Sequence, residues 1–452
     1  MKKEISGVIL SGTNSGCGKT TVCCAVLKAL TNRGLKVGAF KCGPDYIDPT
    51  FHRHITGQTG ANLDPFFFDN DTLRYLLAKH GGVCDVNIVE GVMGYYDGVG
   101  GTEKGSTYDV ARITGLPVVL VIDAEGASLS ALAALEGFAN FKKDSGIRGV
   151  IFNRCSAGTY DFLEKEIQER FHGRIIPLGY LPRALKTGFE SRNLGLVIAD
   201  EIDSIDEKLD ALAQEAEKTL RLDRLLELSG QKTELAFEPP VIKKFDEPVR
   251  IAVAHDRAFC FYYEEALELL REMGAEILPF SPIRDKKLPN GIHGLYLGGG
   301  YPELCAGELS RNAGMRNSIK SALAGGLPCI AECGGFMYLH ESIDGAPMVG
   351  LLTGDAFNKG RLGRFGYVTL TAEKDNMLCK KGESIAAHEF HYWDCEFCGE
   401  DFSAKKSNGR SWRCAVATDT LYAGFPHFHF YSNPRFVENF YKACTGAKNA
   451  ED

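Results

Sequence analysis

The sequence lacks a long hydrophobic run and lacks any excess of positive charge. No stretch approaches the roughly 20 consecutive apolar residues that a membrane helix requires, so we expect no membrane partner. The formal charge of −8 at pH 7 provides no general attraction for nucleic acid, so we expect none as a partner. The apolar residues after Lys2 and Lys3 are interrupted by Ser6 and Gly7, which favours a buried strand over a signal peptide. A cytoplasmic protein is therefore expected.

The sequence also lacks a paired cysteine pattern, although it contains 15 cysteines. Their odd number and irregular spacing favour the reduced thiols of a cytosolic protein over a disulfide framework. Cys395 and Cys398 form one close pair. Without a second pair nearby, they indicate two ordinary loop thiols more than a zinc site.

The chain of 452 residues is too long for one ordinary hydrophobic core. Its first half alternates short apolar runs with amphipathic segments, a pattern typical of a parallel sheet flanked by helices. The same pattern restarts near residue 249, after a polar segment that contains Pro239 and Pro240. We therefore predict an α/β protein with two domains, at residues 1–228 and 249–452, joined by a linker at 229–248.

The stretch SGTNSGCGKTT at residues 11–21 resembles a phosphate-binding loop with unusual spelling. Gly12 lies one residue too early for the common pattern, and Gly16 is additional. An apolar strand enters the stretch and a helix leaves it, so backbone N–H groups and the helix N-terminus would face a phosphate. A plain glycine-rich turn would not explain the Lys-Thr-Thr that opens the helix. The predicted nucleotide-binding residues in this loop are Gly12, Thr13, Gly16, Gly18, Lys19, Thr20 and Thr21.

Four carboxylates follow two predicted strands of the same half. Asp45 and Asp48 lie just past the strand that ends near Lys41, while Glu90 ends another strand and Asp97 lies in its loop. Such residues often serve only as caps or turns, but the carboxyl ends of parallel strands converge on one edge of the sheet. Mg²⁺ prefers hard oxygen ligands beside phosphate, and Lys41 would add positive charge where a phosphoryl group is transferred. The predicted magnesium ligands are Thr20, Asp48 and Glu90.

The spelling G-T-x-x-G-x-G-K-T resembles the phosphate-binding loop of the dethiobiotin synthetase group. That resemblance implies the use of ATP to activate a carboxylate as an acyl phosphate. The loop alone does not separate such an enzyme from the related ATPases that partition plasmids or position the division site.

A second candidate site lies in the other half, where an apolar strand runs into Cys333 followed by two glycines and a helix. A nucleophile on such a turn is exposed beside a helix N-terminus, which favours the thiolate. Backbone N–H groups of Gly299 and Gly300, after another strand, could form an oxyanion hole. His427 and His429 are alternate residues expected to face the same side of a strand, so either could be the base. Each of these features alone more often has a purely structural role. Their combination is rarer and indicates a nucleophilic site.

This combination resembles the class I glutamine amidotransferase domain, in which cysteine attacks the glutamine amide and ammonia is released. The more familiar ending of that family places Pro-Glu after the histidine and supplies a third triad member. Here His427 is followed by Phe-His-Phe, which resembles the variant with a Cys–His dyad. The choice between His427 and His429 stays open, with His427 preferred by alignment with a related Tyr-Leu-His ending.

The segment AAHEFHYWD at residues 386–394 contains His388, Glu389 and His391, which could suggest a metal site. His388 and His391 would fall on opposite faces of a strand. A structural strand is therefore the preferred interpretation.

The motifs FKCGPDYIDPTFH, VEGVMGYYDG, AECGGFMYL and HFHFYSNP, taken in order, resemble the cobyrinic acid a,c-diamide synthase family of cobalamin biosynthesis. The similarity runs from about residue 5 to residue 436. It implies a glutamine-hydrolysing carbon–nitrogen ligase that amidates the a and c acetate groups of a corrin-ring acid, with ATP, Mg²⁺ and L-glutamine. By the same resemblance, Asn153 would recognise adenine, and Asp45, Tyr46 and Asp97 would lie where the tetrapyrrole carboxylate reacts.

Rival hypotheses remain at this point. The same chemistry on another tetrapyrrole, such as nickel sirohydrochlorin, sirohaem or hydrogenobyrinic acid, would share these motifs. A partitioning-type ATPase switch is disfavoured by Cys333 and the histidines, as is a regulatory protein with a dead glutaminase. The ammonia path, the order of the two amidations and the oligomeric state stay open, with a homodimer as one option.

Overall fold

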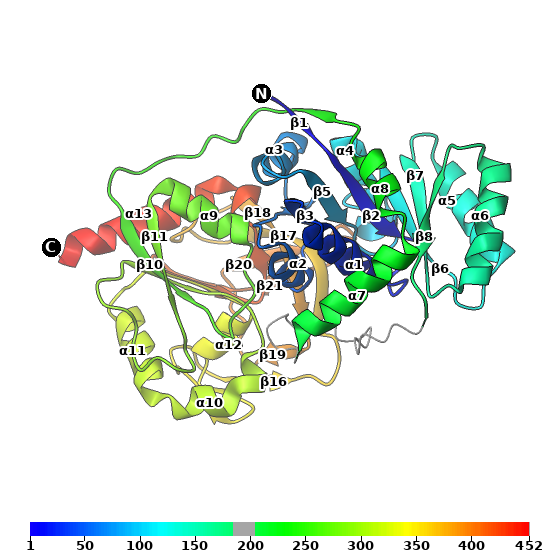
Figure 1. Cartoon of the computed structure of the whole chain (residues 1–452). Coiled ribbons are helices and arrows are strands. Elements are labelled where there is room, and N and C mark those ends of the chain that lie inside the picture. The colour runs from blue at the N-terminus through cyan, green and yellow to red at the C-terminus, as the bar shows by residue number, and fades with distance from the viewer. Residues whose placement is uncertain (184–203, 452) are drawn as a thin grey trace. The chain divides into compact units, whose positions relative to one another are not determined.

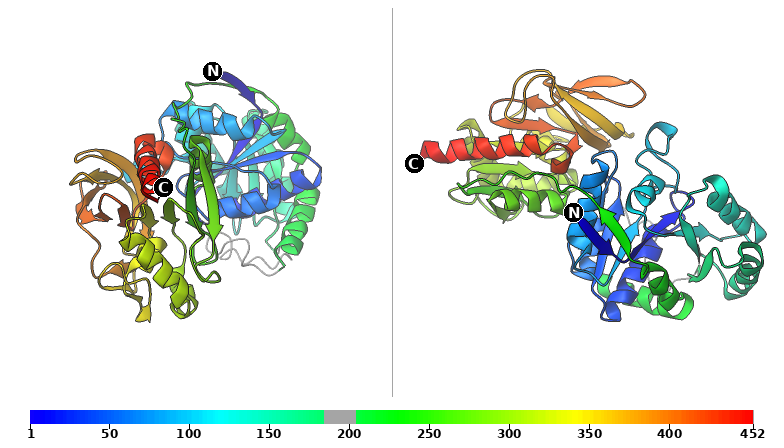
Figure 2. Two further views of the ribbon diagram at one scale, coloured as in Figure 1. Left: turned by 90° about the vertical axis from the view of Figure 1, so that its left-hand side faces the viewer. Right: turned by 90° about the horizontal axis from the view of Figure 1, so that it is seen from above.

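The computed structural model describes residues 1–183 and 204–451, which form two compact units, Met1–Pro240 and Val241–Asp452. Strand β9 (Thr233–Ala236) lies within the interval 229–248 that was expected to be a linker. It pairs antiparallel with β1 (Lys2–Ile5) and lies beside the N-terminus in Figure 2. The ordered structure of the first unit therefore extends into that interval.

The first unit is built on a seven-stranded sheet whose order is β4-β3-β5-β2-β6-β7-β8. All neighbouring strands in it run parallel, so their carboxyl ends share one edge (Figure 1). The strands are β2 (Gly7–Gly12), β3 (Val37–Cys42), β4 (Asn62–Leu63), β5 (Val86–Glu90), β6 (Val118–Asp123), β7 (Ile147–Asn153) and β8 (Ile176–Tyr180).

Both faces of this sheet are covered by helices, as the continuous apolar runs predict. Val8 and Leu10 of β2 pack in a core cluster with apolar residues of α1, α2, α7 and α8. Ile9, which points to the opposite face, is equally buried. The helices of the unit are α1 (Lys19–Asn32), α2 (Asp48–Thr56), α3 (Asn70–Gly81), α4 (Thr107–Thr114), α5 (Leu129–Phe141), α6 (Ala157–Phe171), α7 (Ile205–Thr219) and α8 (Leu222–Ser229).

Local hydrogen bonds explain where several of these helices begin. The side chains of Asp69, Ser106 and Ser156 each accept from a backbone N–H three residues ahead, at the starts of α3, α4 and α6. Such a cap satisfies a helix N–H group that has no partner within the helix.

The second unit contains a six-stranded sheet of order β11-β10-β12-β13-β23-β22, in which only the β22–β23 pair is antiparallel. As in the first unit, the carboxyl ends of the parallel strands lie at one edge of the sheet. At this edge, the chain after β13 turns directly into a helix. Its strands are β10 (Val249–Ala254), β11 (Ala275–Phe280), β12 (Gly294–Leu297), β13 (Cys329–Glu332), β22 (Val416–Ala417) and β23 (Leu421–Gly424). The helices are α9 (Glu264–Met273), α10 (Ala306–Arg311), α11 (Ala313–Ala324), α12 (Gly334–Leu339) and α13 (Pro434–Glu451).

Two further sheets belong to this unit. A five-stranded antiparallel sheet has the order β21-β20-β17-β18-β24, and its β18–β24 pairing places His388 opposite His427. A four-stranded sheet has the order β15-β14-β16-β19. The strands are β14 (Ser342–Ile343), β15 (Ala346–Pro347), β16 (Asp355–Asn358), β17 (Arg364–Ala372), β18 (Ser384–His391), β19 (Trp393–Cys395), β20 (Phe402–Lys405), β21 (Ser411–Cys414) and β24 (His427–Phe428).

The architecture confirms the expected α/β class, with a parallel sheet between helices in the first unit. Within residues 1–183 and 204–451, no helix combines the length and the apolar character needed to cross a membrane.

Candidate active site

The loop between β2 and α1 is shaped by three glycines. Gly16 and Gly18 have φ angles of +82° and +89°, in the left-handed region that favours glycine. A Cβ at Gly18 would lie 2.0 Å from Nδ2 of Asn153, and a Cβ at Gly12 would lie 2.3 Å from Sγ of Cys17. Nδ2 of Asn153 also donates to the carbonyl of Cys17 across 2.9 Å. The displaced glycine is thus required by packing, and Asn153 lies directly against the loop.

Lys19, the first residue of α1, folds back over this loop. Its Nζ donates to the carbonyl of Asn14 at 3.2 Å and to that of Met93 at 2.6 Å. Burial lowers the pKa of the Lys19 ammonium group. Thr13 follows β2, with its hydroxyl bonded to Oδ1 of Asn14, and Thr21 lies half-buried on the first turn of α1. An ammonium group held by two carbonyl oxygens is well suited to meet a phosphate at this loop.

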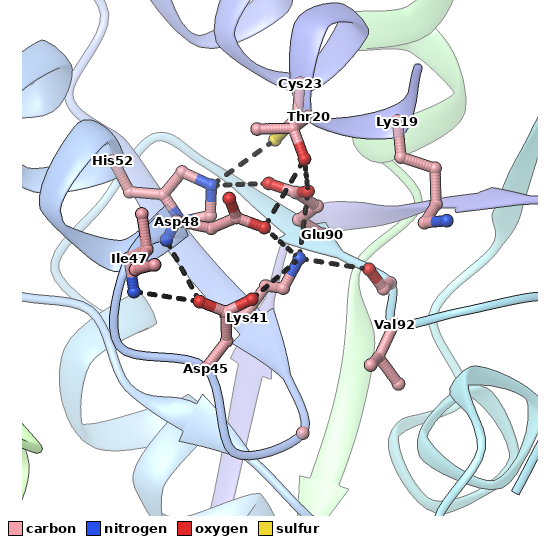
Figure 3. A network of polar contacts seen from close by, with 12 residues as sticks. Lys19, Thr20, Cys23, Lys41, Asp45, Ile47, Asp48, His52, Glu90 and Val92 are labelled. Atoms are coloured by element: carbon pink, nitrogen blue, oxygen red, sulfur yellow. Dashed lines mark hydrogen bonds and ion pairs between the residues drawn. The ribbon is translucent and has the colours of Figure 1, made fainter. Parts of the chain in front are cut away.

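A buried polar cluster lies at the carboxyl ends of β3 and β5 (Figure 3). Oγ1 of Thr20 donates to Oε1 of Glu90 at 2.7 Å and to Oδ2 of Asp48 at 3.4 Å. Nζ of Lys41 donates to Oδ2 of Asp48 and, at 2.9 Å, to Oε1 of Glu90. The structure therefore brings together all three predicted magnesium ligands and Lys41.

The cluster packs one ammonium group, that of Lys41, among neighbouring carboxylates. Burial lowers the pKa of Lys41, but Asp48, Glu90 and Asp45 raise it well above its ordinary value. Burial raises the pKa of Glu90, but Lys41 and His52 lower it well below its ordinary range. Burial and the neighbouring carboxylates raise the pKa of Asp48, and its buried Oδ1 has no hydrogen-bond partner among the described residues. The carboxylates of Asp48, including this oxygen atom, and of Glu90, together with the hydroxyl of Thr20, form a donor set that fits Mg²⁺.

His52 is a member of the cluster that was not among the predicted site residues. Its Nε2 lies 2.7 Å from Oε2 of Glu90 and 3.8 Å from Sγ of Cys23. Among described residues, these three side chains are spaced closely enough to hold a metal ion. Burial raises the pKa of Cys23 well above its ordinary value, so the thiol is protonated when no metal ion is bound, whereas Oε2 of Glu90 is already in contact with His52. We therefore assign His52 to the orientation of Glu90. The sequence signal was its spacing of four residues from Asp48 on one helix.

The three residues predicted near the tetrapyrrole carboxylate have different surroundings. Oδ1 of Asp45 accepts from the backbone N–H groups of Ile47 and Asp48, at the start of α2, and its Oδ2 lies 3.8 Å from Nζ of Lys41. Tyr46 is half-buried next to it. Oδ2 of Asp97 accepts from the N–H of Gly94 at 3.0 Å, within the loop after β5. Asp45 therefore joins the Lys41 cluster, whereas this bond ties Asp97 to its own loop.

Cys333 lies on a strained turn between β13 and α12. Its φ of +48° and ψ of −100° are rare for a residue with a side chain. A Cβ at Gly335 would lie 2.2 Å from the carbonyl oxygen of Leu297, and a Cβ at Gly334 would lie 3.1 Å from the backbone nitrogen of Gly300. Both glycines after the cysteine are thus required for the turn, and Gly300 lies beside it. This is the geometry of a nucleophile elbow.

His427 on β24 contacts this turn. Its imidazole hydrogen-bonds Cys333, and its Nδ1 lies 3.5 Å from Oε2 of Glu332. Burial lowers the pKa of His427, but its bonds with Cys333 and Glu332 and their charges raise it to about 10. A Cβ at Gly299 would lie 2.5 Å from Cε1 of His427, so this glycine allows the ring to reach its position. Glu332 was assigned no role from the sequence.

His429 does not share this position. Its Nδ1 accepts from the N–H of Tyr431 at 3.2 Å, and its Nε2 lies 3.1 Å from Oε1 of Glu265. The expectation that His427 and His429 face one side required an extended strand through both. Instead, β24 ends at Phe428, and a 3₁₀ turn begins at Phe430. Of the two candidate bases, the structure joins His427 to Cys333.

Each half of the chain matches a known protein family. Residues 8–190 match the CobQ/CobB/MinD/ParA nucleotide binding domain, and residues 250–435 match the CobB/CobQ-like glutamine amidotransferase domain.

The chain also resembles whole proteins named cobyrinate a,c-diamide synthase. The protein of Clostridium acetobutylicum is 42% identical over 440 residues, covering 96% of this chain and 99% of that protein. The protein of Caldanaerobacter subterraneus subsp. tengcongensis is 38% identical, covering 97% and 98%. The protein of Thermoplasma volcanium is also 38% identical, covering 98% of each chain.

Proposed function

The chain belongs to the cobyrinate a,c-diamide synthase family, and from this premise we propose how its two sites work. The protein is a glutamine-hydrolysing ligase that amidates the a and c acetate groups of cobyrinic acid in cobalamin biosynthesis. One observation carries the proposal: a strained Cys333 bonded to His427 occurs in the same chain as a phosphate-binding loop facing buried carboxylates. One site supplies nitrogen, and the other activates an acid. The 15 free thiols suit the reducing cytoplasm, where we place the reaction.

The first unit would bind ATP. Lys19 would bind the outer phosphates, Thr13 and Thr21 would contribute hydroxyl groups at the same loop, and Asn153 would recognise adenine. Thr20, Asp48 and Glu90 would hold Mg²⁺, which when bound neutralises and orients the phosphate oxygens. The orphaned Oδ1 of Asp48 supports this assignment.

The acetate carboxylate attacks the γ-phosphorus of ATP, ADP leaves, and an acyl phosphate forms. Lys41, held between Asp48 and Glu90, supplies positive charge to the transferred group. Asp45, Tyr46 and Asp97 position the substrate at the same strand ends. Exclusion of water is required because the mixed anhydride hydrolyses readily.

The second unit would release ammonia from glutamine. His427 takes the proton of Cys333, and the thiolate attacks the side-chain carbonyl of glutamine. Backbone N–H groups of Gly299 and Gly300 stabilise the oxyanion, and His427 returns the proton to the leaving nitrogen. Water then hydrolyses the thioester to glutamate. Ammonia attacks the acyl phosphate, phosphate leaves, and an amide forms; two rounds consume two ATP and two glutamine molecules.

The identity of the macrocycle is tested by product mass. Purified protein is incubated with ATP, Mg²⁺, glutamine and a panel of acids: cobyrinic acid, hydrogenobyrinic acid, nickel sirohydrochlorin and sirohaem. We expect two amides on cobyrinic acid. Amidation of another ring alone would replace the substrate, and ATP hydrolysis indifferent to glutamine and to every acid would support a switch protein.

A further inference from the structure

The residue before the nucleophile is itself placed for a role in catalysis. Glu332 is the last residue of β13, and only 2% of its surface is exposed. Its Oε2 lies 3.5 Å from Nδ1 of His427, whose imidazole hydrogen-bonds Cys333. We propose that Glu332 is a positioning residue that orients His427 and stabilises its charged form, so that the expected Cys–His dyad works as a triad. This inference rests on the proposed glutaminase activity.

The carboxylate of Glu332 is fixed from two directions. Oη of Tyr296, on the neighbouring β12, donates to Oε2 at 3.0 Å. Burial raises the pKa of Tyr296 well above its ordinary value, so the phenol remains a donor. The backbone N–H of Phe428 donates to Oε1 at 3.2 Å. Because Phe428 directly follows His427, the carboxylate is tied to the strand that carries the base as well as to the strand that carries the nucleophile.

The electrostatic consequence follows from burial. When Cys333 loses its proton to His427, an imidazolium ion forms in a site where His427 is only 3% exposed. A buried imidazolium without a counter-charge is costly, and an adjacent carboxylate reduces that cost. Among the described residues, the other titratable groups that act on this histidine or its carboxylate are His388, Tyr262, Tyr296 and Tyr422, and burial keeps all four neutral. Glu332 therefore places a carboxylate directly beside the ring that becomes charged.

A second pair in the same unit provides a matched control. Oε1 of Glu265 lies 3.1 Å from Nε2 of His429, and both residues are as buried as the proposed pair. If any buried carboxylate–imidazole contact merely stabilised the fold, Glu265→Gln and Glu332→Gln would have similar effects. Only Glu332 is bonded to the histidine that contacts Cys333.

The experiment compares wild type, Glu332→Gln and Glu265→Gln in three assays: amidation with glutamine, amidation with ammonia, and alkylation of Cys333 by iodoacetamide as a function of pH. A comparable loss of the acid in a serine triad costs about 10⁴-fold. We expect Glu332→Gln to lose about 100- to 10,000-fold with glutamine while amidation with ammonia stays within about twofold. Its alkylation profile should move to higher pH, because the imidazolium that stabilises the thiolate is weakened. Glu265→Gln should leave the profile unchanged.

Glu332→Asp keeps a carboxylate but moves its oxygens away from His427, because the side chain is one methylene shorter. Its alkylation profile should therefore shift less than that of Glu332→Gln. This variant also serves if Glu332→Gln does not fold. An unchanged alkylation profile in either folded variant, with glutamine-dependent activity within about threefold of wild type, would overturn the role of Glu332 and leave the proposed function intact. Absence of glutamine-dependent amidation in the wild type would instead refute the proposed function. The alkylation profiles would still test whether Glu332 positions His427.

Discussion

Thr20 donates from Oγ1 to Oε1 of Glu90 across 2.7 Å, although the two residues are 70 positions apart in the sequence. The contact exists because β2 and β5 are parallel neighbours, so the loop after one strand lies next to the end of the other. A hydroxyl and a carboxylate that meet at a phosphate-binding loop form a natural position for Mg²⁺.

Removal of this hydroxyl should measurably weaken the affinity of the site for Mg²⁺. Thr20→Val keeps the side-chain shape, and we expect the Mg²⁺ concentration for half-maximal amidation to rise by about 10- to 100-fold, as for one lost bond to a charged group. The measurement is amidation with ammonia over a Mg²⁺ series. Thr31→Val, on the same helix, is the control, and an equal effect of both changes would contradict a role for Thr20.

His52 should act through Glu90 on the same ion. His52→Phe removes the 2.7 Å contact with Oε2 and frees that carboxylate to rotate. Loss of such an outer partner typically costs about 10- to 100-fold in metal affinity. Mg²⁺ titration of ATP binding by calorimetry measures it. His54→Phe changes the same residue type on the same helix, at a partly exposed position paired with Asp206, and should leave the titration unaltered.

Cys333 should be needed for glutamine and dispensable for ammonia. Cys333→Ala removes the nucleophile without touching the ATP site, so amidation with glutamine should disappear while amidation at high ammonia concentration stays within about threefold. Cys329→Ala, which changes a buried thiol on the strand that leads into Cys333, controls for general loss of packing. Loss of both activities in Cys333→Ala alone would mean that the residue is structural.

His388 should make the second unit sensitive to acid. Burial, and then the charges of His427 and Lys406, lower its pKa to about 3, against an ordinary value of about 6.5. Between these values the unfolded chain binds the proton and the folded unit does not, so stability is present above about pH 6.5 and is lost as the pH falls towards 3.

We therefore expect His388→Gln to reduce the loss of unfolding free energy between pH 7 and pH 5, as measured by hydrogen exchange of β18 amides. His172→Gln, at an exposed position, is the control. A pH dependence identical to that of the wild type in His388→Gln would show that another group is responsible.

Much of the first site was accessible from the sequence because its parts are local. A strand, three glycines, Lys19 and Thr20 form one continuous stretch, and Asp48 and Glu90 each end a strand or follow one closely. The general rule that parallel strands end at one edge then brought them together. His52 could not be assigned from the sequence because a histidine on a helix has many ordinary explanations. Its contact with Glu90 depends on how α2 packs against α1 and β3.

The glutaminase site was less accessible, because its geometry depends on where strands end. An extended strand through His427 and His429 would have given both the same face, but β24 stops after Phe428. Glu332 directly precedes Cys333 in the sequence, but its partner His427 is 95 positions away. No local sequence pattern indicates that pairing.

The sequence by itself determined the α/β class, the phosphate-binding loop, the turn that carries Cys333, and the family. These features depend on hydrophobic periodicity, glycine positions and short motifs read along the chain. Only the tertiary structure decided which histidine meets Cys333, how Glu332 and His52 face their partners, and that no described residue hydrogen-bonds Oδ1 of Asp48. The reason is that orientation in a buried polar site results from packing between strands and helices distant in sequence, where a shift of one residue turns a side chain to the opposite face.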